Sequence, residues 1–233
     1  MGDVYRALDP RLEREVAIKV IRSPSSNSDA QARLWREARA AASISHPGVC
    51  QIYDVGESDE QLFIVMELLT GQSLSSRLKD GALKPDEAVT TSLGILSALG
   101  ALHSRQIVHR DLKPSNVFLT EAGIKLLDFG LARSRHSVEG IEQTLTKTGM
   151  VVGTPRYMAP EQWSDQALDP RSDLFAAGAI LFEMLSGQAA FPGNDLMQVY
   201  HAVMSGQPAA LTGSSAVTAI DGVILRALEK GAE

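Results

Sequence analysis

The 233-residue sequence is poor in the features that mark secreted, membrane-spanning or nucleic-acid-binding proteins. Cys50 is its single cysteine, which excludes an internal disulfide framework and favours a reducing compartment. No apolar run approaches the roughly 18 residues that cross a bilayer, and the first residues lack the apolar core of a signal peptide. Acidic residues outnumber basic ones by 28 to 22, which argues against a nucleic-acid partner. We therefore expect a cytoplasmic globular protein, with any membrane anchor outside this chain.

The first part of the chain reads as four short strands and one helix. A polar turn around Asp9 separates the first two apolar runs, and the helix has a stripe of apolar residues at helical spacing. The expected strands are 3–8, 15–21, 49–55 and 61–67, and the expected helix runs from Asp29 to about Ser45. This pattern predicts a small antiparallel sheet with one helix.

The second part of the chain reads as mainly helical, with a few short strands. A long polar loop over residues 131–158 is rich in Ser and Thr, and a loop of that length usually serves a function. Expected helices lie at 85–105, 174–185, 194–205 and 214–229, and expected strands at 107–108, 116–119 and 124–127. The helix over 174–185 is apolar on nearly every side, which predicts a buried helix.

The strongest chemical signal is the run HRDLKPSNV over residues 109–117, followed by Asp128. Asp111 is placed to orient an attacking hydroxyl group, and Lys113 to offset phosphate charge. Asn116 and Asp128 supply the hard oxygen ligands that Mg²⁺ prefers. This combination is the one needed to transfer a phosphoryl group.

Each of these residues has a plainer interpretation when it is taken alone. His109 could be an ordinary core histidine, and the polar residues near Pro114 could be turn formers. Lys19, in the apolar strand VAIKV, could extend its ammonium from a sheet edge into water. Glu37 on the following helix is a plausible salt-bridge partner for Lys19, which would leave Lys19 facing nucleotide phosphates. The joint spacing of all these residues favours the functional interpretation.

Five motifs together resemble those of serine/threonine protein kinases, in particular the eukaryotic-like kinases of bacterial signalling. They are VAIK (16–19), HRDLKPSN (109–116), DFG (128–130), GTPRYMAPE (153–161) and DLFAAG (173–178). The resemblance covers essentially the whole chain. It implies an α+β fold with two lobes: a small antiparallel β-sheet lobe with one helix, and a larger, mainly helical lobe. The expected division is 1–67 for the first lobe, 68–71 for the hinge and 72–233 for the second.

The resemblance also implies ATP as the nucleotide, bound between the lobes with Mg²⁺ or Mn²⁺. The residues that it assigns to ATP are Val4 and Ala17 above the adenine, Phe118 below it, Met66 as gatekeeper, the backbones of Glu67 and Leu69 at its edge, and Lys19 with Glu37 at the phosphates. The substrates implied are proteins with Ser or Thr acceptors. A dimer would allow one copy to phosphorylate another.

Regulation is expected in the Thr-rich segment before Gly153. In similar kinases an arginine at the position of Arg110 pairs with a phosphorylated residue of this segment, and Thr146 and Thr148 are the best candidates here. The plainer alternative is a solvated polar loop. Thr154 would help to hold the catalytic residues in place. Asp173 would bond the backbone of the HRD turn, or serve only as a favourable charge at a helix N-terminus.

The sequence departs from the family pattern at both ends. Only Gly2-Asp3-Val4 remains of the glycine-rich loop, and the arginine that usually pairs with Glu161 would follow the last residue. We therefore expect a domain without its first strand and last helix, with an exposed sheet edge. One alternative function is a catalytically weak, pseudokinase-like binding module. Another is a small-molecule kinase such as an aminoglycoside phosphotransferase, which the APE motif and the Thr-rich segment argue against.

Overall fold

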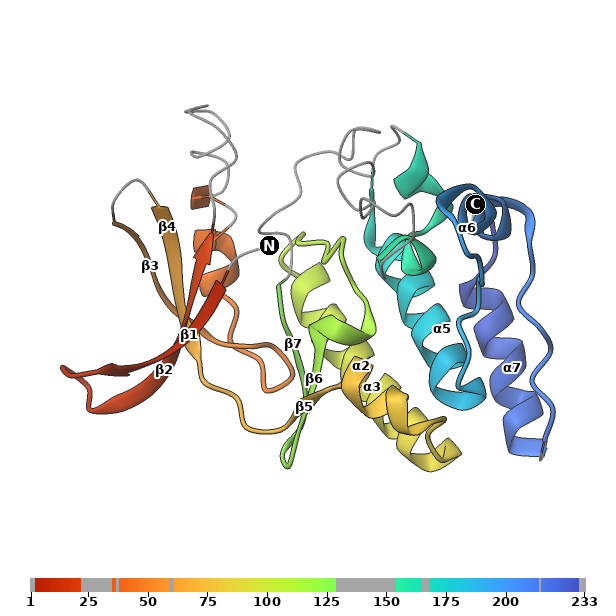
Figure 1. Ribbon diagram of the computed structural model, residues 1–233, viewed down its shortest axis with the longest axis horizontal. Coiled ribbons are helices and arrows are strands. Elements are labelled where there is room, and N and C mark those ends of the chain that lie inside the picture. The colour runs from red at the N-terminus through yellow and green to blue at the C-terminus, as the bar shows by residue number, and fades with distance from the viewer. Residues whose placement is uncertain are drawn as a thin grey trace.

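The computed structural model describes residues 3–21, 35–36, 38–58, 61–128, 154–164, 168–213 and 215–230. Two antiparallel sheets lie beside a group of helices (Figure 1). The first sheet has the order β1-β2-β4-β3 and contains β1 (Asp3–Asp9), β2 (Arg14–Ile21), β3 (Ile52–Ser58) and β4 (Gln61–Glu67). The second has the order β5-β6-β7 and contains β5 (Gln72–Ser73), β6 (Val117–Thr120) and β7 (Gly123–Leu126).

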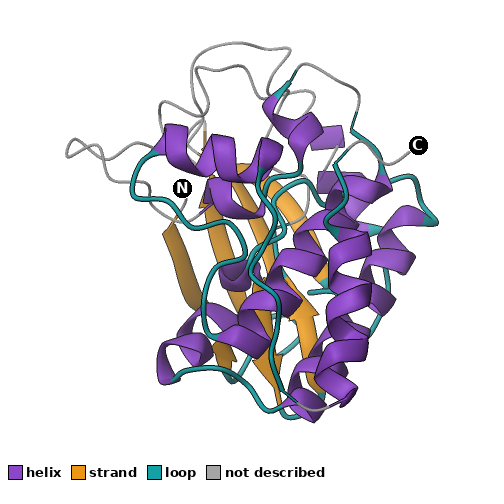
Figure 2. Cartoon of the chain, turned by 90° about the vertical axis from the view of Figure 1, so that its right-hand side faces the viewer, coloured by secondary structure: helices purple, strands orange, loops and turns teal. Residues whose placement is uncertain are grey.

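In Figure 2 the helices lie in front of the strands. They are α2 (Leu74–Arg77), α3 (Pro85–His103), α5 (Pro170–Ser186), α6 (Leu196–Ser205) and α7 (Ser215–Ala227). Helices α2 and α3 lie between β5 and β6 in the sequence, and α5 to α7 follow β7. Short 3₁₀ turns are η1 (Leu78–Asp80), η2 (Pro114–Asn116), η3 (Thr154–Tyr157) and η4 (Pro160–Trp163). Residues 35–36 and 38–42 are also helical, which agrees with the helix expected there. Among the described residues, no helix combines the length and apolarity needed to cross a membrane.

Helix α5 forms the centre of the helical part. Asp169 caps its N-terminus by accepting a hydrogen bond from Arg171 N at 2.7 Å, and Pro170 has a φ suited to the first helical position. The helix ends at Gly187, whose φ of 70° is a conformation that glycine adopts without strain. Both α3 and α7 pack against α5. Buried apolar side chains from α3 and α5 share one core with residues of the first sheet and its helix, which confirms that α5 is a buried helix.

Two of the expected strands differ from the structure. The strand expected at 49–55 begins at Ile52, because residues 48–50 pair with β7 instead: Cys50 N donates to Leu126 O at 3.0 Å and Leu126 N donates to Gly48 O at 2.8 Å. This pairing ties the first part of the chain to the second sheet.

The strand expected at Ile107-Val108 does not form. After α3, Gln106 has a φ of 59°, and Ile107 N donates to Leu102 O at 3.1 Å. The chain therefore turns back onto the end of the helix, and the Ile107 N–H group is used there rather than in a ladder.

Candidate active site

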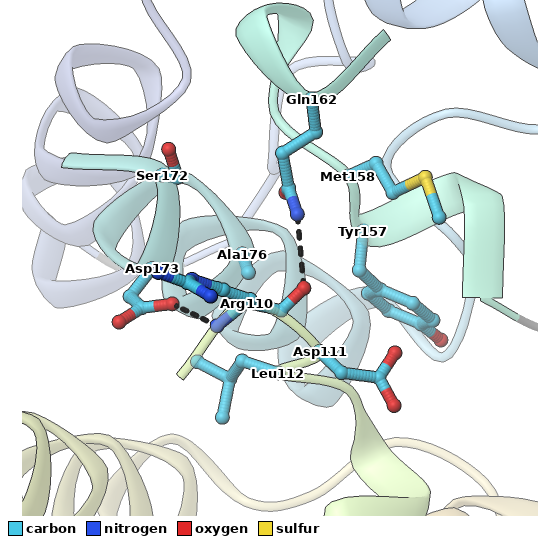
Figure 3. A pocket seen from close by; sticks show the side chains of 9 residues that line it. All are labelled: Arg110, Asp111, Leu112, Tyr157, Met158, Gln162, Ser172, Asp173 and Ala176. Carbon is cyan, nitrogen blue, oxygen red and sulfur yellow. Dashed lines mark hydrogen bonds between the residues drawn. The ribbon is translucent and has the colours of Figure 1, made fainter. Parts of the chain in front are cut away.

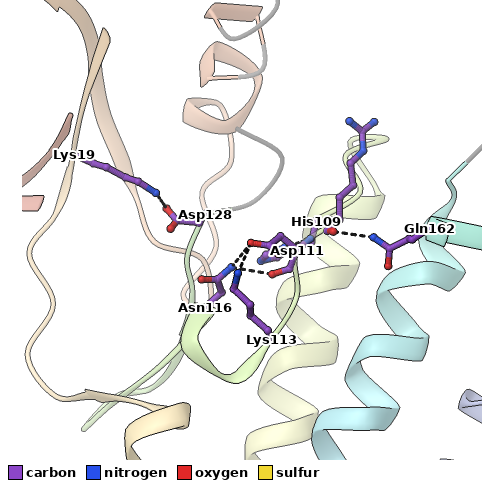
Figure 4. A network of polar contacts seen from close by, with 8 residues as sticks. Lys19, His109, Asp111, Lys113, Asn116, Asp128 and Gln162 are labelled. Carbon is purple, nitrogen blue, oxygen red and sulfur yellow. Dashed lines mark hydrogen bonds and ion pairs between the residues drawn. The ribbon is translucent and has the colours of Figure 1, made fainter. Parts of the chain in front are cut away.

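Asp111 lies in the turn between α3 and η2, where its carboxylate meets two other predicted site residues. Its Oδ2 is 2.8 Å from Lys113 Nζ and 3.1 Å from Asn116 Nδ2 (Figure 4). The same Asn116 Nδ2 donates to the backbone oxygen of Asp111 at 2.8 Å. The structure thus brings the three residues of the HRDLKPSN motif together around one carboxylate.

Asp173, in the first turn of α5, holds the backbone of this turn. Its Oδ2 accepts a hydrogen bond from His109 N at 2.8 Å, and its Oδ1 accepts one from Arg110 N at 3.0 Å. His103 Nε2 lies 2.7 Å from the same Oδ2. The prediction that Asp173 bonds the HRD turn is confirmed. Arg110 has a φ of 65°, a strained conformation for a residue with a side chain, so the surrounding hydrogen bonds are needed to maintain it.

His109 is fully buried beneath the turn. Burial lowers its pKa, because a charged imidazolium is disfavoured away from water, although the nearby Asp173 and Asp111 oppose the shift. Its Nδ1 accepts a weak hydrogen bond from Asp111 N at 3.4 Å. A neutral ring with Nδ1 unprotonated is consistent with both observations, and it places His109 in a supporting role.

Lys19 of β2 reaches the second sheet, where its Nζ lies 2.5 Å from Asp128 Oδ1 (Figure 4). Asp128 follows β7 and has a φ of 56°. Leu127 N donates to Asn116 O at 2.9 Å, so the segment that carries Asp128 lies against the one that carries Asn116. The predicted partner of Lys19, Glu37, lies outside the described residues, so that pairing stays a prediction.

The donor set at this site fits the expected Mg²⁺. Asn116 uses its amide nitrogen on Asp111, which turns its carbonyl oxygen away and makes it available as a ligand. Lys19 contacts only Oδ1 of the Asp128 carboxylate, which makes Oδ2 a candidate ligand. Both are hard oxygen donors of the kind that Mg²⁺ prefers. The described residues contain no group of three or more His, Cys, Asp or Glu side chains suited to a metal.

Of the side chains assigned to the adenine, Val4, Ala17 and Met66 share the sheet face of Lys19. In the strand register Val4 is opposite Lys19 and Ala17 is opposite Met66, and residues opposite one another project to the same face. Val4 is 59% exposed at the edge strand β1, whereas Ala17 is buried.

The connector between the two sheets runs along β6. A Cβ atom on Gly71, which has a φ of 139°, would lie 2.0 Å from Leu119 O, so only glycine fits there. Phe118 Cε1 would lie 3.4 Å from the same Cβ position, which places the ring beside the connector. Glu67 and Leu69, at the end of β4 and within the connector, are half-buried.

Several contacts near the site were not foreseen from the sequence. Glu67 Oε2 lies 2.7 Å from Lys125 Nζ and accepts a hydrogen bond from Gln51 N at 3.2 Å, so its side chain joins the first sheet to β7. Tyr157 OH donates to Glu183 Oε2 at 2.5 Å, and burial raises the pKa of both groups. No sequence signal marks these pairs, because each joins segments far apart in the chain.

A hollow lies beside the catalytic turn (Figure 3). It is lined by Arg110, Asp111, Leu112, Tyr157, Met158, Gln162, Ser172, Asp173 and Ala176. Asp111 lines it, whereas Lys19 and Asp128 do not. Ser172 Oγ also donates to Glu161 Oε1 at 2.6 Å, which gives the half-buried Glu161 a partner within the described residues.

Some predicted residues cannot be compared with the structure. The DFG residues after Asp128, and Thr146 and Thr148, lie outside the described residues. Thr154 begins η3, but its side chain is not among those described.

Comparison with known proteins shows that the chain belongs to the protein kinase domain family, which matches residues 1–219. A probable serine/threonine-protein kinase of Streptomyces coelicolor is 38% identical over 239 residues, which cover 99% of this chain and 35% of that protein. The serine/threonine-protein kinase PrkC of Bacillus subtilis is 37% identical, with 99% and 36% covered. The serine/threonine-protein kinase PknL of Mycobacterium tuberculosis is 37% identical, with 84% and 49% covered. The chain thus spans about a third to a half of these relatives. The predicted family and two-lobed α+β fold are confirmed.

Proposed function

We propose that this chain is the catalytic part of a protein serine/threonine kinase that transfers the γ-phosphate of ATP to Ser or Thr hydroxyl groups of proteins. The observation that carries the proposal is the cluster around Asp111: Lys113 Nζ at 2.8 Å and Asn116 Nδ2 at 3.1 Å from one carboxylate oxygen. Membership of the protein kinase domain family supports the same activity. Because the relatives are named as kinases, the pseudokinase alternative is not favoured.

Asp111 orients the acceptor hydroxyl and accepts its hydrogen bond, so that the oxygen attacks the γ-phosphorus in line with the leaving oxygen. Lys113, already 2.8 Å from this carboxylate, lies near enough to offset the charge that spreads over the transferred phosphoryl oxygens. Asn116 maintains the position of Asp111 through its amide nitrogen. Positioning and electrostatic stabilisation account for most of the catalysis of such a reaction.

Lys19 binds the α- and β-phosphates, and Asn116 with Asp128 holds Mg²⁺. When bound, the metal neutralises charge on the phosphate oxygens. The contact between Lys19 and Asp128 supports this arrangement, because a cation and a carboxylate that meet at 2.5 Å lie within reach of one phosphate group and its metal. Val4, Ala17, Met66 and Phe118 contact the adenine, with the backbones of Glu67 and Leu69 at its edge. Mn²⁺ would serve the same ligands.

The proposal extends to organisation and control. Residues 1–67 and 72–233 act as two lobes about the hinge 68–71. The activity belongs to the cytoplasm, where the substrate ATP is found. Autophosphorylation at Thr146 and Thr148, by a second copy of the chain, adds phosphate groups that can pair with Arg110. Mass spectrometry of ATP-treated protein tests this, and protein that transfers phosphate but carries none between Ser134 and Thr154 would contradict it.

The activity is tested by incubating the protein with γ-labelled ATP, Mg²⁺ and a Ser/Thr-rich protein substrate. We expect label on Ser or Thr of the substrate, and a loss of about a hundredfold or more in the Asp111→Asn variant. Asp80→Asn, at an exposed position of η1, is the matched control. Nucleotide binding without transfer would leave only a binding module, and label confined to a small-molecule acceptor would overturn the protein substrate.

A further inference from the structure

Gln162 makes two hydrogen bonds that join η4 to the catalytic turn. Its Nε2 donates to the backbone oxygen of Arg110 at 2.9 Å (Figure 3). Its Oε1 accepts from the backbone nitrogen of Ala159 at 2.9 Å. The residue is only 5% exposed, so water does not readily replace either partner. The bond to Arg110 joins Gln162 to a residue 52 positions earlier in the chain.

The orientation of this amide follows from its partners. An N–H group faces one end of the side chain and a carbonyl oxygen faces the other, so the oxygen must point to Ala159 and the nitrogen to Arg110. A carboxylate at the same place would put one of its oxygen atoms next to the backbone oxygen of Arg110, and neither atom could donate a hydrogen bond. An apolar side chain would leave both backbone groups without these partners. Both requirements favour a primary amide here.

The bond to Arg110 acts on the peptide group that precedes Asp111. Arg110 has a φ of 65°, and Asp173 holds only the N–H side of this residue. Gln162 holds the carbonyl side, and that carbonyl belongs to the same peptide plane as the N–H of Asp111. Rotation of this plane would move the Asp111 backbone and, with it, the carboxylate that meets Lys113.

We propose that Gln162 is a positioning residue for Asp111, and that it transmits the placement of η4 to the catalytic turn. For its kinetic consequence the inference rests on the kinase activity proposed above. The η4 turn directly follows η3 and residues 158–159, so a displacement of this segment would release the carbonyl of Arg110 and disorder the turn before Asp111.

The test compares Gln162→Met, which is similar in size but has no amide, with Gln162→Glu. For Gln162→Met we expect kcat to fall about tenfold or more, with the KM for ATP changed less than about twofold, because the nucleotide contacts are untouched. For Gln162→Glu we expect a similar loss near pH 8 that is partly restored near pH 6. Full burial raises the pKa of a glutamate from about 4.3 by up to about 3–5 units, and a protonated carboxyl can again donate to Arg110 O. Gln188→Met, at an exposed position after α5, is the matched control.

Amide hydrogen exchange provides a readout that does not depend on activity. Protection of the Arg110 and Asp111 amides should fall in Gln162→Met, while that of α3 stays as in the unsubstituted protein. Unchanged kcat in Gln162→Met, a pH-independent loss in Gln162→Glu, or unchanged protection at Arg110 and Asp111 would each overturn the inference. If the unsubstituted protein transfers no phosphate, the proposed function fails instead, and the exchange result alone decides whether Gln162 positions the turn.

Discussion

Lys19 and Asp128 form an ion pair at 2.5 Å that joins β2 of the first sheet to the segment after β7 of the second. The two side chains are 18% and 38% exposed. A pair so accessible to water contributes little to stability, typically about 1 kcal/mol or less. We infer that the two residues are placed for chemistry rather than for stability.

Replacement of Asp128 with alanine should therefore abolish phosphate transfer and leave the fold intact. We expect transfer to fall about a hundredfold or more, and the free energy of unfolding to change by about 1 kcal/mol or less. The measurements are the labelled-ATP assay and urea unfolding. Asp54→Ala, at an exposed position of β3, is the control. Transfer retained by Asp128→Ala would refute the metal assignment.

Asp173, unlike Asp128, should contribute strongly to stability, because it is 1% exposed and accepts hydrogen bonds from two backbone N–H groups. Asp173→Ala leaves those buried donors and His103 without their acceptor. We expect a loss of about 3–5 kcal/mol in the free energy of unfolding, measured by urea denaturation. Asp169→Ala, which removes the exposed cap of the same helix, should cost only about 1 kcal/mol. Equal losses in the two variants would contradict the larger contribution to stability expected from the buried hydrogen bonds of Asp173.

Cys50 offers a simple probe of the connection between the two sheets. Its side chain is 5% exposed, and burial together with the Glu67 carboxylate raises the pKa of the thiol to about 12. Because the thiolate is the reactive form, iodoacetamide near pH 8 should label the native protein at least about tenfold more slowly than the urea-unfolded chain. Mass spectrometry gives the labelled fraction. Similar labelling rates in both states would mean that residues 48–50 do not remain paired with β7.

Lys230 should make stability depend on pH in alkaline solution. Its Nζ lies 3.9 Å from the ring centroid of Phe191 and 4.7 Å from that of Phe175, and burial lowers its pKa from 10.5 to about 8. Between about pH 8 and 10.5 the unfolded chain then binds more protons at this residue than the native protein does, so this residue's contribution to stability rises with pH across that window.

The corresponding experiment is urea unfolding of the unsubstituted protein and of Lys230→Met at several pH values between about 8 and 10.5. The difference in unfolding free energy should shift toward the unsubstituted protein as pH rises, since methionine has no proton to release. Other groups that titrate in this range act in both proteins and cancel in the difference. A difference that is independent of pH would contradict the lowered pKa of Lys230.

Much of this architecture follows from local sequence patterns. Apolar runs separated by polar turns predicted β1, β2 and β4, and the apolar run 174–185 predicted most of α5, which begins earlier, at Pro170. The errors at Ile107-Val108 and at the start of β3 share one cause. In each case an apolar run was expected to form a strand, whereas its backbone N–H groups found partners in α3 or β7.

The chemical content of the candidate site was set by the sequence alone, since the spacing of Asp111, Lys113 and Asn116 already defines which groups can meet within one turn. Only the tertiary structure decided which distant residues support that turn: Asp173 on its N–H side and Gln162 on its carbonyl side. The physical reason is range. Helix caps and strand alternation act over a few neighbouring residues, whereas these hydrogen bonds join positions 63 and 52 residues apart and exist only once α5 and η4 have packed against the end of α3.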